Sequence, residues 1–418
     1  MNMKRCCRRA LAGLICAAMF LGAAPAAWAE EAPAIIAEQG SGENAADLIK
    51  ESEEVWLPAS TVPADAAALE VGGKSAVLME LSSGKVLFEK NAHEKLAIAS
   101  VTKVMTLLLV MEAIDKGLIA YEDQVTCSAT AASMGGSQIW LKEGEVMTVH
   151  ELLKAAAVVS ANDACAALAE HISGSIEGFV SQMNERAAEL GMNDTKFIDC
   201  SGLSDDAYSS AYDVALMSRE LMKHKKIIEY TTIWMDTLRG GKSQLVNTNK
   251  LVRHYNGATG LKTGTTAKAG HCLSATAERD GMGMLAVILG CETTDERFGG
   301  ARKMLDFGFA NYAVYTPKVD ASALHPVKVL HGMEPQVEAV ADTPVPMLIK
   351  KGQEKSVAVA TELAEDLEAP VDKGQVIGRI VLTLDGAEAA EYSIRAAADV
   401  AELNFRRALE RLWFSLVA

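Results

Sequence analysis

Short apolar runs separated by turn residues indicate strands in two separate parts of the chain. In the first part, Ser82-Ser83-Gly84 supplies the turn of a β-hairpin. In the second part, Asp280-Gly281 separates two runs, and this dipeptide favours a tight turn between antiparallel strands. The expected strands cover residues 76–80, 85–90, 261–265, 271–277 and 284–289.

Between these two groups of strands the apolar spacing changes to that of helices. A long apolar run ends at Asp115-Lys116-Gly117, and a glycine just after the last turn is a common helix stop. Thr148 and Glu151 form a capping-box pattern, which predicts the first turn of another helix. Ser160-Ala161-Asn162-Asp163 then interrupts the run, so we expect a break between two helices there. The expected helices cover about 100–114, 148–159, 164–172, 178–190, 210–223 and 294–311.

After about residue 317 the pattern changes to short β-like runs separated by turn residues. This change predicts a small all-β second domain, with the boundary at 315–322. An antiparallel sheet with helices, followed by this domain, belongs to the α+β class. The expected strands of the second domain cover 327–330, 336–341, 345–349, 356–359 and 376–384.

The tail, residues 397–418, has the spacing of an amphipathic helix, which Leu403 and Phe414 interrupt. A basic amphipathic helix can lie in a membrane interface, so we expect this tail to bind a membrane surface. The alternative is that the tail packs on its own domain. The apolar side carries Phe405, Leu409, Leu412, Trp413 and Leu416, and the charged residues are Arg406, Arg407, Glu410 and Arg411.

The first residues have the form of an export signal. A basic start with Lys4, Arg5, Arg8 and Arg9 precedes an apolar stretch, and Ala27-Trp28-Ala29 has the small-x-small pattern of a cleavage site. We therefore expect a signal peptide over 1–29, cleaved after Ala29, and a solvated linker over 30–70. An uncleaved N-terminal anchor is the alternative. No internal apolar run reaches the length of a spanning helix, which excludes a multi-pass membrane protein.

Charge and cysteine content exclude several functional classes. The 418 residues carry a net charge of −15, so the protein repels phosphate backbones and we expect no nucleic-acid partner. Five cysteines follow the leader, and no C-x-x-C pair occurs among them, which argues against a zinc ribbon or a disulfide scaffold. We expect buried free thiols, although the sequence leaves one disulfide possible. These cysteines are Cys127, Cys165, Cys200, Cys272 and Cys291.

Ser100-Val101-Thr102-Lys103 places a hydroxyl and an amine one helical turn apart on the same face. A serine needs an adjacent base to become a nucleophile, and a lysine serves only when neutral, which costs about 4 kcal/mol at pH 7. Burial and a second nearby cation lower that cost. A helix N-terminus also offers N–H groups to a developing oxyanion. Alone, the S-x-x-K spacing is weak evidence, because a capping serine beside a solvated lysine has the same pattern.

Two further short segments add candidate chemistry. Ser160 and Asn162 lie at the expected helix break, where a hydroxyl and an amide can relay a proton and hold a substrate carbonyl. Lys262-Thr263-Gly264 lies in an expected strand, where the glycine would let a ligand backbone approach and Lys262 would bind a carboxylate and assist the neutral state of Lys103. Helix capping by Asn162 or Asp163, and a surface-strand lysine, are the alternatives.

The three segments in this order resemble the S-x-x-K, S-D-N and K-T-G set of penicillin-binding proteins and β-lactamases, with Ala161 in place of the aspartate of S-D-N. The chain resembles the low-molecular-weight penicillin-binding proteins, the serine-type D-alanyl-D-alanine carboxypeptidases, over about 70–395. The narrower match rests on longer stretches. These are Ile98-Ala99-Ser100-Val101-Thr102-Lys103-Val104-Met105-Thr106, Gly136-Ser137-Gln138-Ile139-Trp140, Ser160-Ala161-Asn162-Asp163-Ala164 and Gly260-Leu261-Lys262-Thr263-Gly264-Thr265-Thr266.

The resemblance implies a β-lactamase/transpeptidase-like domain and assigns catalytic roles by position. Ser100 would be the acylated nucleophile and Lys103 its general base. Ser160 and Asn162 would shuttle a proton and position the substrate. The N–H groups of Ser100 and Thr265 would form the oxyanion hole. The implied domains are a carboxypeptidase domain over 71–316, an all-β domain over 317–396 and a membrane-associating helix over 397–418.

The resemblance also implies how the substrate binds. Lys262 and Thr263 of the K-T-G segment, which Gly264 completes, would hold the terminal carboxylate, and Arg297 of Asp295-Glu296-Arg297 would assist. The substrate would be a peptidoglycan stem peptide ending in D-Ala-D-Ala, and β-lactams would be covalent inhibitors. No metal or organic cofactor is implied, and the expected location is the outer face of the cytoplasmic membrane or the cell envelope.

Two other hypotheses stay open from sequence: a catalytically silent wall-binding module and a β-lactamase. The β-lactamase is disfavoured because the acidic E-x-x-L-N segment of class A enzymes is missing between Asn162 and Lys262. Glu189-Leu190-Gly191 does not fit it. A zinc-dependent route is disfavoured because His93-Glu94 and His150-Glu151 lack the second histidine of H-E-x-x-H. Release of D-Ala from a pentapeptide separates the remaining hypotheses.

Overall fold

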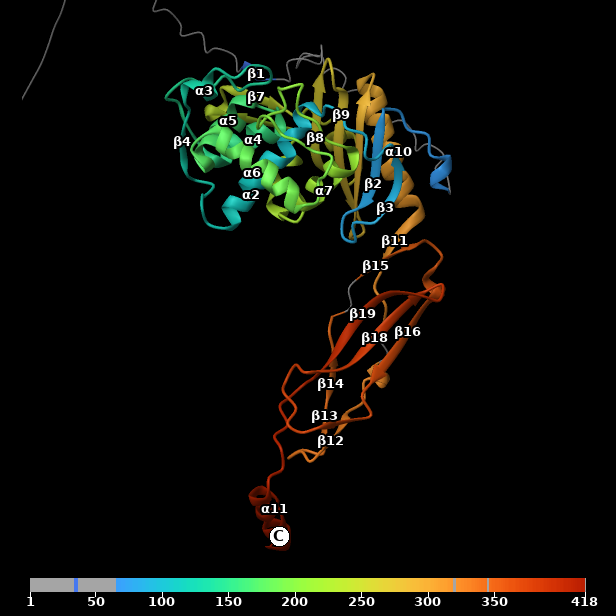
Figure 1. Ribbon diagram of the computed structural model, residues 1–418. Helices are drawn as coiled ribbons and strands as arrows, with labels where there is room; N and C mark the ends of the chain where they lie inside the picture. The colour runs from blue at the N-terminus through green and yellow to red at the C-terminus, as the bar shows by residue number, and fades with distance from the viewer. Residues whose placement is uncertain (1–33, 37–64, 319–320, 344–345, 418) are drawn as a thin grey trace, which may run out of the picture.

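The computed structural model describes residues 34–36, 65–318, 321–343 and 346–417. A layered domain of helices and strands lies at one end of the molecule, a narrow all-β domain follows it, and the C-terminal helix lies at the opposite end (Figure 1). The expected signal peptide, most of the expected linker, and residues 344–345 lie outside the described residues.

The layered domain is built on a five-stranded sheet in the order β3-β2-β10-β9-β8, in which every neighbouring pair is antiparallel. All five strands predicted for this domain are confirmed, and Asp280-Gly281 forms the β9–β10 turn as expected. Among the described strands β8 lies at the edge of this sheet, so its outer side can pair with an extended ligand. The strands are β2 Ser75–Glu80, β3 Val86–Lys90, β8 Ala258–Thr266, β9 Gly270–Arg279 and β10 Met282–Cys291.

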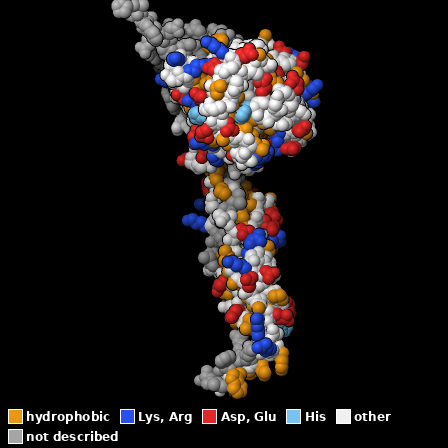
Figure 2. Space-filling model, turned by 90° about the vertical axis from the view of Figure 1, so that its left-hand side faces the viewer, with side chains coloured by type: hydrophobic (Ala, Val, Ile, Leu, Met, Phe, Trp, Pro, Cys, Tyr) orange, Lys and Arg blue, Asp and Glu red, His pale blue; other side chains and the backbone are white. Residues whose placement is uncertain are grey.

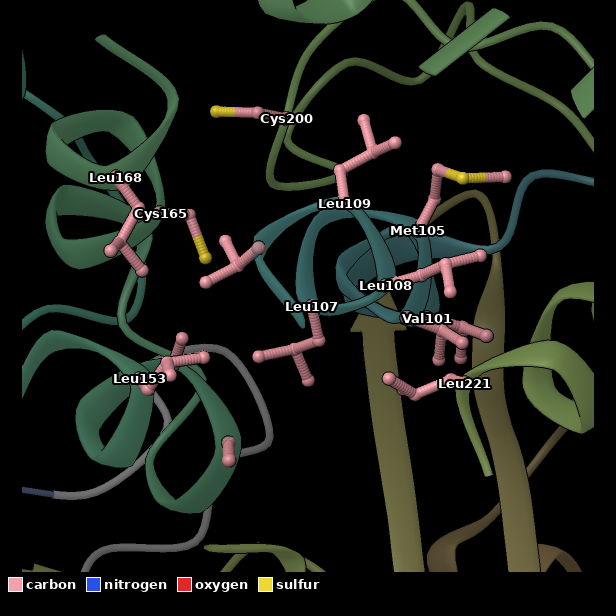
Figure 3. Packing of buried hydrophobic residues seen from close by; sticks show 14 of the residues in the cluster. Val101, Met105, Leu107, Leu108, Leu109, Leu153, Cys165, Leu168, Cys200 and Leu221 are labelled. Carbon is pink, nitrogen blue, oxygen red and sulfur yellow. The ribbon is translucent and has the colours of Figure 1, made fainter. Parts of the chain in front are cut away.

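The sheet is covered on both faces, which explains the continuous apolar run of β10. Alternate residues of β10 enter two cores: Leu285 and Val287 pack with α2 and α7, whereas Met284 and Ala286 pack with α10. Helix α2 is buried on nearly its whole circumference, between the sheet and the α4–α5 pair. Leu153 of α4, Cys165 of α5 and Leu221 of α7 surround it (Figure 3).

The long helices confirm the predicted ones, with changes at their ends. The helix expected from residue 100 begins with a 3-10 turn, η2 Ala99–Thr102, and becomes α-helical at Lys103. The helix expected at 178 begins at Ile176, because the Ser175 hydroxyl accepts from the Gly178 N–H at 3.0 Å and caps it. The helices are α2 Lys103–Asp115, α3 Ala129–Ala132, α4 Val149–Val158, α5 Asn162–Ser173, α6 Ile176–Glu189, α7 Ala211–Leu221, α8 Ile228–Thr231, α9 Leu251–His254, α10 Thr294–Asn311 and α11 Phe405–Val417.

Short elements that the pattern did not predict join these helices. They contain three or four residues each, too few to establish a period. Strand β1 pairs in parallel with β7, and β7 pairs with β6. They are β1 Ala34–Ile36, β4 Gln124–Thr126, β5 Val146–Thr148, β6 Met235–Leu238 and β7 Ser243–Val246, with 3-10 turns η1 Ala66–Ala68, η3 Lys225–Ile227, η4 Arg239–Gly241, η5 Ala321–Ala323 and η6 Glu354–Ser356.

The second domain is all-β, as predicted, but its strands differ in detail. The single strand expected over 336–341 is two strands, because Val337 pairs with β12 whereas 339–341 pairs with β19. Strand β19 was not predicted, since its sequence is rich in alanine and glutamate, which are poor strand formers. The strand β11 Tyr312–Tyr315, at the end of the first domain, pairs with β15. The strands of the second domain are β12 Val327–Leu330, β13 Gln336–Val337, β14 Ala339–Ala341, β15 Met347–Lys350, β16 Val357–Leu363, β17 Asp366–Glu368, β18 Val376–Leu384 and β19 Ala387–Ala396.

The C-terminal helix is shorter than predicted. It covers Phe405–Val417, whereas Val400 and Glu402 form bridges to Val371 and Gly332 of the all-β domain. Residues 397–404 therefore belong with that domain rather than with the helix. Within the described part of the chain, no helix is both long and apolar enough to cross a membrane.

Candidate active site

Ser100 and Lys103 lie side by side at the start of α2. In the 3-10 turn η2, residues three apart lie on the same side, and the Lys103 Nζ lies 2.9 Å from the Ser100 Oγ. The Ser100 side chain is half-buried, whereas Lys103 is 0% exposed. The nucleophile–base pair expected from the S-x-x-K spacing is therefore brought together, with the serine on the accessible side.

A second contact holds Lys103, and sequence reasoning missed it. The ammonium donates to the Ser201 carbonyl at 2.7 Å, and Ser201 lies on the loop between α6 and α7. The Thr106 hydroxyl donates to the neighbouring Cys200 carbonyl at 2.6 Å. The sequence does contain one indication of an ordered turn here: Asp199, because an aspartate side chain can accept hydrogen bonds from the backbone N–H groups that follow it.

The Ser160-Ala161-Asn162 segment forms the break between α4 and α5. Ser160 is buried with a φ of +63°, which turns the chain, and Asn162 donates from its Nδ2 to the Gly135 carbonyl at 2.7 Å. Within the described residues, the Ser160 Oγ and the Asn162 Oδ1 have no hydrogen-bond partner. Two buried oxygens without partners are available to a ligand.

Asp163 bonds both the first turn of its own helix and a neighbouring loop. The N-cap of α5 is Ala161, so neither Asn162 nor Asp163 is the N-cap residue, but the Asp163 carboxylate accepts from the first-turn N–H of Ala164 at 2.9 Å. The buried carboxylate accepts from the N–H groups of Ile139 and Leu141, at 3.1 and 3.0 Å. Burial raises the pKa of Asp163, which these N–H groups oppose. The 136–141 segment is thereby held beside Asn162.

Gly264 brings strand β8 directly against the nucleophile. A Cβ on Gly264 would lie 2.7 Å from the Ile98 carbonyl oxygen and 2.9 Å from the Ser100 nitrogen. The sequence suggested that this glycine makes room for a ligand backbone. The structure shows a second reason for the glycine, because the chain's own residues 98–101 lie where its Cβ would be. The approach of a ligand backbone along the edge of β8 stays a prediction.

The other residues of the K-T-G segment are buried in β8. Lys262 donates to the Thr263 carbonyl at 2.9 Å, and the Thr263 hydroxyl bonds that of Thr248 at 2.7 Å. Burial raises the pKa of the Cys165 thiol to about 11, and the charges of Lys103 and Lys262 both act to lower it. The charges of both ammonium groups therefore act on this one sulfur atom.

Arg297 reaches the end of the same strand from α10. Its Nη1 lies 3.2 Å from the Thr265 Oγ1 and 3.4 Å from the Gly264 carbonyl oxygen, and the side chain is 3% exposed. Its guanidinium lies 4.7 Å from the Phe298 ring centroid. The structure thus joins Arg297 to the K-T-G segment, as the resemblance implied.

The cysteines and metal-binding groups add no further centre. All five cysteines of the described chain are free and buried, and burial raises the pKa of each thiol. Thiols in this state are poorly reactive. Among the described residues, no three His, Cys, Asp or Glu side chains gather as a metal site.

Comparison with known proteins gives a consistent result over nearly the whole chain. Residues 61–293 match the family of D-alanyl-D-alanine carboxypeptidases, and 316–402 match the C-terminal domain of penicillin-binding protein 5. The carboxypeptidase DacF of Bacillus subtilis is 45% identical over 343 residues, which are 81% of this chain and 88% of that protein.

Solved structures agree with these matches. Penicillin-binding protein 5 from Haemophilus influenzae superposes with a TM-score of 0.69 at 31% identity, covering 82% of this chain and 100% of that one. Penicillin-binding protein D2 from Listeria monocytogenes, solved in its ampicillin-bound form, gives a TM-score of 0.51 at 32% identity, covering 58% of this chain and 99% of that one.

Proposed function

The chain belongs to the serine-type D-alanyl-D-alanine carboxypeptidases of the penicillin-binding protein family, and we propose that Ser100 is its nucleophile and Lys103 its general base. The observation that carries this assignment is the 2.9 Å contact between the buried Lys103 Nζ and the Ser100 Oγ. Lys103 accepts the hydroxyl proton as the Oγ bonds to the carbonyl carbon of the penultimate D-Ala.

The rest of the reaction follows from this pair. The bond to the terminal D-Ala breaks, and the departing amine takes a proton relayed through Ser160. Water then attacks the ester carbon and releases the shortened peptide, while the Oγ regains its proton. We assign the oxyanion hole to the N–H groups of Ser100 and Thr265. The absence of a side chain at Gly264 lets β8 lie directly against the start of η2, next to the Ser100 N–H group.

We assign substrate binding to the side-chain oxygen of Asn162 and to the part of β8 where Lys262 and Arg297 supply positive charge. The Asn162 Oδ1 is a buried acceptor for a substrate amide. Lys262 and Arg297 supply positive charge for the terminal carboxylate, and Thr263 adds a hydroxyl that bonds Thr248 and keeps capacity for another bond. A peptidoglycan stem pentapeptide ending in D-Ala-D-Ala fits this arrangement.

A labelled penicillin tests the assignment of Ser100, because a β-lactam presents a reactive amide and a carboxylate in one small molecule. The wild-type protein should become covalently labelled and the variant Ser100→Ala should not. Equal labelling of both proteins would refute the nucleophile. Release of D-Ala from a pentapeptide, measured in parallel, connects labelling with turnover.

We further propose that α11 lies in a membrane surface. The large apolar side chains of α11 are exposed, and hydrophobic side chains gather at the far end of the molecule, where α11 lies (Figures 1 and 2). An amphipathic helix in this position can bury its apolar face at the lipid boundary. The all-β domain, which we place at 317–404 because of the bridges of Val400 and Glu402, then separates the catalytic domain at 71–316 from that surface.

Export through the signal peptide 1–29 completes this proposal, because stem peptides lie outside the cytoplasm. Deleting the helix, residues 405–418, should move the exported protein from the membrane fraction to the soluble fraction. Retention in the membrane fraction would contradict a role of the tail as anchor. N-terminal sequencing of the mature protein tests cleavage after Ala29.

A further inference from the structure

One loop, residues 199–205, contacts the S-x-x-K segment directly and is connected to the other two motif segments through their neighbouring residues. The Ser201 carbonyl accepts from Lys103, and a Cβ on Gly202 would overlap the Ala99 carbonyl. Leu203 contacts Gly136, the same residue that packs on Asn162. The loop therefore meets the S-x-x-K segment directly and the S-x-N segment through the 136–141 segment.

The far end of the loop meets the strand that carries K-T-G. The Thr266 hydroxyl donates to the Asp205 carboxylate at 3.1 Å, and the Lys268 ammonium donates to the Asp205 carbonyl at 2.5 Å. Thr266 is the last residue of β8. A shift of this loop would consequently disturb the relative placement of all three motifs.

The carboxylate of Asp199 fixes the fold of this loop. It accepts from the Ser201 N–H at 2.6 Å, from the Ser201 hydroxyl at 3.1 Å, from the Gly202 N–H, and from the Ser204 N–H at 2.7 Å. Hydrogen bonds from N–H groups to an ionised carboxylate are among the stronger ones in proteins. With four donors on one side chain, the direction of the Ser201 carbonyl depends on Asp199.

We propose that Asp199 is a positioning residue of the active site: by ordering residues 199–204 it holds the Ser201 carbonyl against Lys103. A neutral amine has two hydrogens and one lone pair. When one hydrogen is donated to the Ser201 carbonyl, the amine is oriented so that its lone pair can face the Ser100 hydroxyl 2.9 Å away. Asp199 does not touch the reacting atoms; it acts through Ser201 on Lys103. This inference rests on the proposed role of Lys103 as base.

Three variants test the role of Asp199. Asp199→Ala removes all four bonds, whereas Asp199→Asn keeps an oxygen that can accept the three bonds made to Oδ1. Asp206→Asn is the matched control, because Asp206 is an exposed carboxylate in the same region. For each protein we would measure the rate of acylation by a fluorescent penicillin, kcat and KM for D-Ala release, and the melting temperature.

The expected result is a loss in kcat rather than in KM. A misplaced reactive group costs on the order of 100-fold in rate, so Asp199→Ala should lower kcat and the acylation rate by about that factor. Asp199→Asn should restore roughly a tenth of the wild-type rate or more, with KM within about threefold, and Asp206→Asn should match the wild type.

Two outcomes would overturn the inference. One is a normal kcat per labelled molecule in Asp199→Ala, which would mean that the carboxylate only stabilises the fold. The other is equal loss in Asp199→Asn and Asp199→Ala together with a raised KM, which would mean a role in binding. If Asp199→Ala does not fold, the inference is judged on Asp199→Asn alone, again by whether kcat or KM changes. Labelling of Ser100→Ala would instead refute the catalytic assignment on which this inference rests.

Discussion

Gly264 of β8 lies directly against Ser100 at the start of α2: a Cβ on Gly264 would come within 2.9 Å of the Ser100 nitrogen. Real Cβ atoms rarely approach a backbone atom so closely. The close approach sets the strand beside the nucleophile, so that the two N–H groups assigned to the oxyanion hole belong to adjoining segments.

Gly264→Ala should therefore lower the rate of acylation more severely than it lowers the stability of the protein. The methyl group would push β8 away from η2, and a displacement of about 1 Å is enough to reduce the rate by roughly 100-fold. Overpacking of this kind should also destabilise the protein by about 1–3 kcal/mol. Penicillin acylation rates and thermal unfolding measure the two effects.

Gly299→Ala is the control for this prediction. Gly299 lies in α10, and a Cβ there would meet no atom within 4 Å. Alanine in a helix is favoured over glycine by up to about 1 kcal/mol, so this variant should be active and slightly more stable. If Gly264→Ala acylates as fast as Gly299→Ala, then the close approach has no catalytic importance.

The sequence was sufficient to predict the parts of the site that lie on regular elements. Ser100 and Lys103 are three residues apart, so their contact follows from local geometry alone. Lys262 and Gly264 lie in a strand that the apolar pattern identified. The helix break at Ser160 and Asn162 could be predicted from the sequence. The sequence could not show that the Ser160 Oγ and the Asn162 Oδ1 would lack hydrogen-bond partners among the described residues.

Residues that act through long-range contacts could not be predicted in this way. Asp199 bonds residues within its own loop, but that loop meets Lys103 only because α6 and α7 pack around α2. The contact of Gly264 with residues 98–101 was not predicted for the same reason, since these residues are distant from it in sequence. The C-terminal helix was predicted too long, because the bridges of Val400 and Glu402 to the all-β domain leave no trace in the helical spacing.

Ser160→Ala should separate activity from stability. The buried Ser160 Oγ has no hydrogen-bond partner within the described residues, so its removal breaks no bond and relieves an unsatisfied buried group. We expect unfolding free energy equal to the wild type or higher by up to about 1 kcal/mol. Because proton transfer by a positioned group contributes roughly 10²–10⁴-fold, D-Ala release should fall by that range.

Chemical denaturation and a D-Ala release assay on the same preparation check this prediction. A second variant, Ser173→Ala, removes another buried hydroxyl oxygen that lacks a partner, at the end of α5. It should leave the release rate unchanged. A large loss of stability in Ser160→Ala would show that its hydroxyl has a structural bond in solution.

The ion pair between Glu145 and Arg239 should make stability depend on pH. Burial alone would raise the pKa of Glu145, but the Arg239 guanidinium, whose Nε lies 2.6 Å from the carboxylate, lowers it below its usual value. A lowered pKa in the folded state means that the carboxylate stabilises the fold at neutral pH. This contribution begins to fall near the ordinary pKa of 4.5, and it is lost as the pH drops through the lower pKa that Glu145 has in the folded protein.

Glu145→Gln should consequently cost about 1 kcal/mol at pH 7 and progressively less below about pH 4.5. The measurement is the difference in unfolding free energy between variant and wild type across pH 3–7. Glu94→Gln, at an exposed carboxylate in the same domain, supplies the control. A difference that stays constant over this pH range would contradict the ionic origin of the stabilisation.

The last prediction concerns the exposed apolar side of α11. Leu409 and Leu412 are 58% and 59% exposed, so the fold gains little from them. Replacing both with glutamate should abolish binding to vesicles that contain anionic lipid, because the carboxylates would enter the lipid boundary, and should leave the melting temperature unchanged. The control is Val340→Glu on β14, an apolar side chain that is 54% exposed and lies outside the helix. Sedimentation with vesicles should retain the control and release the double variant. If both proteins stay bound, the membrane contact lies elsewhere in the chain, and if neither the double variant nor the wild type binds, the tail is not an anchor.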